Sequence, residues 1–139
     1  MKAIITLGPE GFRTEIKTGA ALEHTVIADE PIEANGTNQG PTAMGLLAAA
    51  LGTCTVATLR SYANLKNLPL KGVVVEVETQ RRTPSEQNEA GPNAKMMLIR
   101  KKITIEGDLT PEQRERMLQI AEKCPVNRTL LEGVDMVKG

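Results

Sequence analysis

Aromatic residues are nearly absent from this sequence, whose 139 residues include one Phe, one Tyr and no Trp. Aliphatic side chains and methionine must therefore fill the core, because the large rings that usually dominate buried area are missing. The same absence excludes an aromatic platform for nucleic-acid bases, and the basic runs at 81–82 and 100–102 have no aromatic neighbour. We expect no nucleic-acid partner.

Excess charge is also absent, since 17 basic and 17 acidic residues give a formal net charge of +0. The charges are interspersed, so they indicate neither a basic surface nor an acidic tail. The N-terminal segment holds only a short apolar run, interrupted by Gly8, Pro9 and Glu10, which is too short for a secretory signal. We therefore expect a cytoplasmic protein and, at this length, a single domain over residues 1–139.

No charged residue occurs from Pro41 to Leu59. A membrane span needs about 20 predominantly apolar residues, whereas this run contains four threonines and two glycines. We interpret it as a buried central helix that runs from about Pro41 to about Lys66, and we expect no membrane partner. Its many small residues allow a neighbouring backbone to approach closely, and that neighbour can be a second subunit.

The remaining pattern predicts an α+β fold. Short runs rich in Ile, Val and Thr, separated by Gly and Pro, predict strands. A Thr-Pro-Glu-Gln capping box at 110–113 opens a second helix that is expected to end near Cys124. The expected strands are 2–7, 12–17, 22–28, 69–82, 96–107 and 134–138, and a mobile loop is expected at 83–94.

Ligands for a metal or a cofactor are scarce. His24 is the only histidine, and one imidazole with two distant cysteines does not make a zinc site. No Walker loop and no GxGxxG motif occurs. The carboxylates Asp29, Glu30 and Glu33 cluster in a turn-rich loop, where we expect them to be solvated. The sequence predicts no metal and no cofactor.

The chemistry that remains is a pair of cysteines, Cys54 and Cys124. Cys54 lies on the uncharged helix, where a cysteine often only fills the core. Cys124 continues the apolar stripe of the second helix, seven residues after Met117, and Pro125 disfavours a helical conformation at Cys124. Two core-facing thiols, one of them at a position where the helix is interrupted, can come within disulfide reach, about 4.4 to 6.8 Å between Cα atoms. In a reducing compartment such a pair is typically catalytic.

The segments around both cysteines resemble a known family. The first segment has Gly40-Pro41-Thr42 and an Ala-rich helix that ends Leu51-Gly52-Thr53-Cys54, and the second runs from Glu122 through Cys124-Pro125 to Leu130. In this order they are similar to the osmotically inducible protein C and organic hydroperoxide resistance superfamily (OsmC/Ohr), over about residues 22 to 138.

The resemblance implies a fold and a reaction. The fold is an intertwined homodimer in which curved antiparallel sheets wrap central helices, with an active site at each subunit interface. In the reaction, Cys54 attacks a hydroperoxide and becomes a sulfenic acid, and Cys124 resolves it as a disulfide that an external dithiol reduces. A second thiol nearby protects the first from over-oxidation.

One feature departs from the family. Peroxidase members carry a glutamate about nine or ten residues before the first cysteine, which holds an arginine against the thiolate, and Met44 and Gly45 stand there in this chain. Three arginines are candidates for the cation, namely Arg13, Arg100 and Arg128, although each is more typical of a solvated surface charge. The departure favours an alternative function, a non-enzymatic dimer that binds a small apolar ligand.

Overall fold

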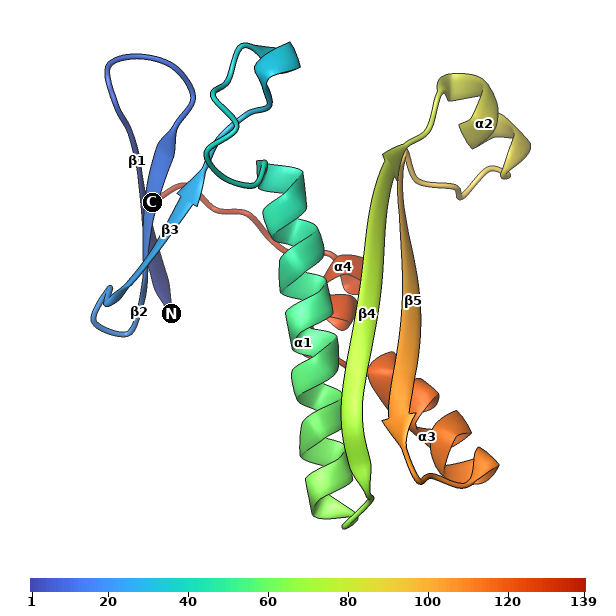
Figure 1. The fold of residues 1–139 in the computed structure, drawn as a ribbon. Helices are drawn as coiled ribbons and strands as arrows, with labels where there is room; N and C mark the ends of the chain where they lie inside the picture. Colours follow the sequence, from blue (N-terminus) through green and yellow to red (C-terminus); the bar gives the residue numbers. More distant parts are fainter. The chain divides into compact units, whose positions relative to one another are not determined.

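The computed structural model describes residues 1–139, which divide into two compact units, Met1–Leu47 and Ala48–Gly139. Each unit is described by itself, and the elements of both are labelled in Figure 1. Each contains one antiparallel sheet, so the chain has the α+β class that the sequence predicts. The single domain expected over 1–139 stays a prediction.

The first unit is built on a three-stranded antiparallel sheet of order β1-β2-β3. The strands are β1 (Lys2–Leu7), β2 (Thr14–Gly19) and β3 (His24–Ala28), and a 3-10 turn, η1 (Ile32–Ala34), follows. The last two strands begin two residues later than predicted, because Gly11 and Leu22 adopt left-handed conformations with φ of 70° and 59° that extend the preceding turns.

A buried carboxylate organises the loop after β3, and the expectation that Asp29 is solvated is therefore wrong. Asp29 is 3% exposed. Its Oδ2 accepts hydrogen bonds from the Thr37 hydroxyl and from the N–H groups of Thr37 and Gln39, and its Oδ1 accepts from the Glu30 N–H at 2.8 Å. The Thr37 hydroxyl bond, followed by the backbone bonds, outweighs burial and lowers the pKa of Asp29. Glu33 is exposed, as expected.

The long helix α1 (Ala43–Leu65) begins two residues after the predicted start. The Thr42 hydroxyl accepts the Gly45 N–H at 3.1 Å, so Thr42 takes the role of a helix cap that we had not assigned to it. Its buried positions form one stripe with a spacing of four residues, namely Leu51, Thr55, Leu59 and Ala63.

A two-stranded antiparallel ribbon supports the second unit. Its strands are β4 (Leu70–Arg81) and β5 (Met97–Gly107), in which Val75 pairs with Ile103. The short helix α2 (Pro84–Glu89) replaces the irregular loop that we expected. Thr83 and Glu86 form a capping box that starts α2, a signal that the interpretation of 83–94 as a loop overlooked.

Two helices follow the ribbon, α3 (Pro111–Ala121) and α4 (Pro125–Glu132). The predicted capping box opens α3, where Thr110 and Gln113 bond reciprocally. The helix ends at Ala121 rather than near Cys124, because helical structure is interrupted over residues 122–124 and a new helix begins at Pro125. The strand predicted at 134–138 is wrong, since those residues are exposed and pair with no other strand.

The core of the second unit is aliphatic, as the shortage of aromatic residues predicts. Met117, Leu59 and Ala121 are fully buried, with 0% exposure. They form one cluster that joins α1, the ribbon and α3, and the remaining members are Ala63, Leu70 and Leu109. The cysteine-bearing segments are thus tied to a packed core.

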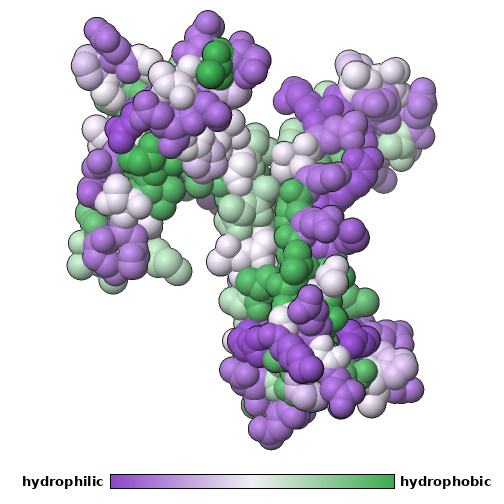
Figure 2. Space-filling view, in the orientation of Figure 1, coloured by the Kyte–Doolittle hydropathy of each residue, from purple (hydrophilic) through white to green (hydrophobic).

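Much of α1 remains uncovered within the single chain. By length and composition α1 is long and apolar enough to cross a membrane, a test that core helices of soluble proteins also pass. Only 17% of its most apolar window is buried within the chain. Figure 2 shows hydrophobic side chains at the surface along α1 and β4. The predicted burial of α1 is therefore met only along its one stripe.

Candidate functional site

The first predicted site residue, Cys54, lies in the middle of α1. It is half-buried and directly precedes Thr55, which belongs to the buried stripe. A residue this far from the helix N-terminus gains little from the helix dipole. Burial raises the pKa of the Cys54 thiol and the neighbouring Cys124 sulfur adds to the rise, which outweighs opposing hydrogen bonds from the Val126 N–H and the Thr58 side chain.

The second predicted site residue, Cys124, caps the N-terminus of α4. Its backbone is extended, with φ of −58° and ψ of 136°, so it lies at the interruption of the helix that Pro125 predicts. Its side chain is fully buried, and its Sγ accepts the Asn127 N–H at 3.3 Å and lies 3.9 Å from the Thr55 hydroxyl oxygen. Cysteine thus occupies the position that Ser, Thr, Asp or Asn usually fills.

The two cysteines come together, as predicted. Both are free thiols, and each shifts the pKa of the other, so their side chains are neighbours. Burial acts to raise the pKa of Cys124, but hydrogen bonds from the Asn127 N–H, from Cys54 and from Thr55 outweigh it and leave that pKa below its ordinary value. Hydrogen bonds therefore favour the thiolate form of Cys124, whereas burial disfavours that of Cys54.

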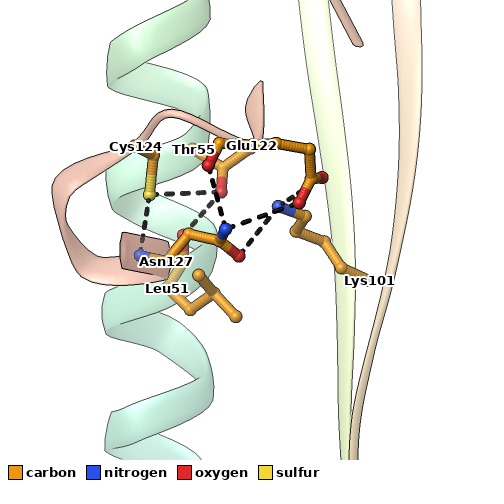
Figure 3. A network of polar contacts seen from close by, with 6 residues as sticks. All are labelled: Leu51, Thr55, Lys101, Glu122, Cys124 and Asn127. Carbon is orange, nitrogen blue, oxygen red and sulfur yellow. Dashed lines mark hydrogen bonds and ion pairs between the residues drawn. The ribbon is translucent and has the colours of Figure 1, made fainter. Parts of the chain in front are cut away.

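A polar network surrounds Cys124 that the sequence analysis did not predict (Figure 3). Asn127 Nδ2 donates to the Glu122 backbone carbonyl at 3.0 Å, and Lys101 Nζ contacts Asn127 Oδ1 at 3.4 Å and Glu122 Oε1 at 3.0 Å. One signal pointed to Asn127, since it follows Cys124 by three residues, the spacing of a helix cap. Lys101 had no such signal within the basic run 100–102.

A cavity of about 380 Å³ borders this network. Lys101, Glu122 and Asn127 supply its polar wall. The rest of the lining is mainly aliphatic and consists of Leu51, Met97, Ile99, Leu130, Leu131 and Lys95. Such a lining suits a small organic molecule that carries one polar group.

The candidate arginines do not bond to either thiol. Arg13 Nε donates to Gln39 Oε1 at 3.0 Å, Arg100 donates to Gln80 at 2.8 Å, and Arg128 pairs with Glu132 at 3.2 Å. At the positions of the family glutamate, Met44 is 40% exposed and Gly45 has no side chain to hold a cation. His24 is exposed and its Nε2 lies 3.6 Å from Glu23 Oε1, and no group of three metal-ligating side chains occurs in the chain.

A family model with the description "OsmC-like protein" matches residues 36–137, which include both cysteines and the network around Cys124. The chain belongs to the OsmC-like family. The resemblance stated from the two cysteine segments is therefore confirmed. Among curated proteins, none matches the chain.

Solved structures share the OsmC-like fold at low sequence identity. An OsmC-like protein from Mycoplasma pneumoniae has a TM-score of 0.74 and 16% identity, and the match covers 96% of this chain and 87% of that one. An organic hydroperoxide resistance protein OsmC from Legionella pneumophila has a TM-score of 0.64 and 21% identity, with coverages of 96% and 90%. An organic hydroperoxide resistance protein from Elizabethkingia anophelis has a TM-score of 0.62, 19% identity, and coverages of 91% and 85%.

Proposed function

We propose that this protein is a thiol peroxidase that reduces organic hydroperoxides with Cys54 and Cys124. The observation that carries the proposal is that two free thiols, one half-buried and one fully buried, lie beside each other. Membership of the OsmC-like family and the fold shared with hydroperoxide resistance proteins support it.

The proposed cycle begins at Cys54, which is the more accessible thiol. Its sulfur attacks the distal oxygen of the hydroperoxide, the O–O bond breaks, and the alcohol leaves with the thiol proton. Cys54 is then a sulfenic acid. The Cys124 thiolate attacks the Cys54 sulfur, a disulfide forms, and the departing hydroxide takes a proton from solvent to become water.

Each turnover ends with an external dithiol, which supplies two electrons and two protons to the disulfide. Such a reductant is available in a reducing, cytoplasmic compartment, where we place the protein. The lowered pKa of Cys124 favours the resolving step, because a larger share of the attacking group is thiolate. The raised pKa of Cys54 slows the first step at neutral pH.

We further propose that the protein works as a homodimer. A shallow hollow of about 380 Å³ on α1 and β4 is lined only by small or β-branched residues: Ala48, Ala49, Gly52, Thr53, Val56, Val75 and Val77. These side chains allow the close approach of another backbone, and little of α1 is covered by its own chain. A folded monomer in sedimentation at micromolar concentration contradicts this part of the proposal.

The deciding experiment measures consumption of an organic hydroperoxide with a dithiol reductant. We expect turnover by the unaltered protein, a rate that rises from pH 7 toward 9, and no turnover by Cys54→Ser. Ser61→Ala, a small change at an exposed position of the same helix, is the matched control and should keep the rate. Mass spectrometry of the oxidised protein should show the loss of two hydrogen atoms. Two free thiols beside undiminished peroxide would remove the peroxidase assignment.

A second candidate function rests on a cavity in the first unit. It has a volume of about 490 Å³ and a mostly apolar lining that includes Ile5, Leu7, Phe12, Ile16 and Leu46. This space suits a small apolar ligand without any redox step. A fluorescent apolar probe distinguishes the two candidates, since binding of the probe by a protein that consumes no peroxide favours the ligand-binding function.

A further inference from the structure

Lys101 is buried in a way that its neighbour Lys102 is not. The Lys101 side chain is 10% exposed, whereas that of Lys102 is 72% exposed. The two residues are consecutive on β5, so their side chains point to opposite faces of the ribbon. A nearly buried ammonium group needs partners, and Lys101 has the Glu122 carboxylate at 3.0 Å and the Asn127 amide oxygen at 3.4 Å.

Asn127 is held at three points. An ammonium group can only donate, so the Asn127 amide oxygen must face Lys101. Its amide nitrogen then donates to the Glu122 backbone carbonyl at 3.0 Å, and its backbone N–H donates to Cys124 Sγ at 3.3 Å. Figure 3 shows these contacts as one continuous path from Lys101 to the sulfur.

We propose that Lys101 is a positioning residue for Cys124, which acts through Asn127 to hold the first turn of α4 against the sulfur. The N-terminus of α4 presents N–H groups and partial positive charge to the sulfur, and this favours an anion only while the turn stays in place. The inference rests on the proposed function only in that Cys124 is the resolving thiol of the cycle.

Other charged groups near Cys124 are either paired or exposed. Cys54 from α1 is a neighbouring thiol that lowers the pKa of Cys124, and the Glu122 carboxylate is paired with Lys101. On α4, Arg128 is paired with Glu132, and both side chains are more than 60% exposed. Lys123 is exposed. Lys101 is thus the one nearly buried cation in direct contact with the residues that hold Cys124.

The test titrates Cys124 by thiolate absorbance near 240 nm in a Cys54→Ser background, where it is the only thiol. One Tyr and no Trp make the background absorbance low. We expect Lys101→Met to raise the midpoint by about half to one unit. Lys101→Arg keeps a charged donor and should restore most of the shift. Lys102→Met makes the same charge change on the exposed face and should leave the midpoint unchanged.

Two results overturn the inference. One is an unchanged midpoint in Lys101→Met, and the other is an equal shift in Lys102→Met, which indicates a general charge effect. If Lys101→Met does not fold, as judged by circular dichroism, Asn127→Ala takes its place. It keeps the backbone N–H but loses the side-chain link, so it should also raise the midpoint, and an unchanged value overturns the inference. The titration uses no peroxide, so a failure of the peroxidase proposal remains distinguishable.

Discussion

Asp29 in the first unit and Cys124 in the second collect hydrogen bonds in the same way. Each is buried, and each accepts backbone N–H groups and a threonine hydroxyl. In both cases these bonds lower the pKa of the accepting group. The two sites differ in where their donors come from and in what lies beside the acceptor.

All the donors of Asp29 lie within ten residues of it, in its own loop. Cys124 also takes donors from α1, where Thr55 lies 69 residues away in the sequence and Cys54 adds a second thiol. A cage closed by one loop stabilises that loop. A cage that joins distant elements around a nucleophilic sulfur places it beside a reaction partner, and this difference separates a structural anion from a candidate catalytic one.

The largest expected effect comes from removal of the acceptor sulfur. Cys124→Ser should lower steady-state peroxide turnover with a dithiol reductant by on the order of 100-fold or more, because the sulfenic acid of Cys54 then has no resolving partner. Asp29→Asn is the matched control and should keep turnover, since Asp29 has no redox neighbour. The measurement is the rate of hydroperoxide loss in both variants.

Mass spectrometry after repeated peroxide exposure sharpens this result. Cys54 should gain two oxygen atoms as a sulfinic acid in Cys124→Ser and should form a disulfide in the unaltered protein. Full turnover in Cys124→Ser without over-oxidation would show that the external dithiol resolves Cys54 directly. The hydrogen bonds around Cys124 would then have no catalytic role that distinguishes them from those around Asp29.

A second prediction concerns the backbone of the Asp29 loop. A Cβ atom at Gly36 would overlap the Glu30 carbonyl group, so Gly36→Ala must displace this loop. We expect a loss of about 1 to 3 kcal/mol in the free energy of unfolding. At Gly8 no atom lies within 4 Å of the corresponding position, and Gly8→Ala should change stability by less than about 0.5 kcal/mol. Denaturant unfolding measures both, and equal effects contradict a tightly closed loop.

The strands and the main helices were predictable because their signals are local. Alternating β-branched residues marked β4 and β5 to within one residue at each end. The elements that were missed depend on caps or on pairing. The Thr83 capping box was overlooked, α4 starts from a cysteine cap that no usual pattern includes, and residues 134–138 have strand-like composition but no partner strand.

The site was predictable in its thiols but not in its surroundings. Cys54 and Cys124 are recognisable from their segments, because cysteine is rare and each lies on an apolar pattern. The role of Lys101 depends on which face of β5 it occupies, and burial separates it from Lys102 in a way that adjacent positions in the sequence do not. The burial of Asp29 likewise depends on the loop closing around it.

The smallest expected effect is the pH dependence of the Asp29 cage. The Thr37 hydroxyl and three backbone N–H groups lower the pKa of Asp29 in the folded state. A lowered native pKa contributes stability that is present above the unfolded pKa of about 3.9 and is lost as pH falls through the native pKa.

Asp29→Asn keeps the shape of the side chain but not its charge. Its thermal midpoint should therefore lie below that of the unaltered protein at pH 7, and the gap should narrow below about pH 4. Glu33→Gln, at an exposed position of the same loop, should show no gap at either pH. A gap for Asp29→Asn that stays constant from pH 7 to pH 3 would mean that the second acceptor oxygen, which Asn replaces with an NH2 donor, matters for this loop rather than the charge.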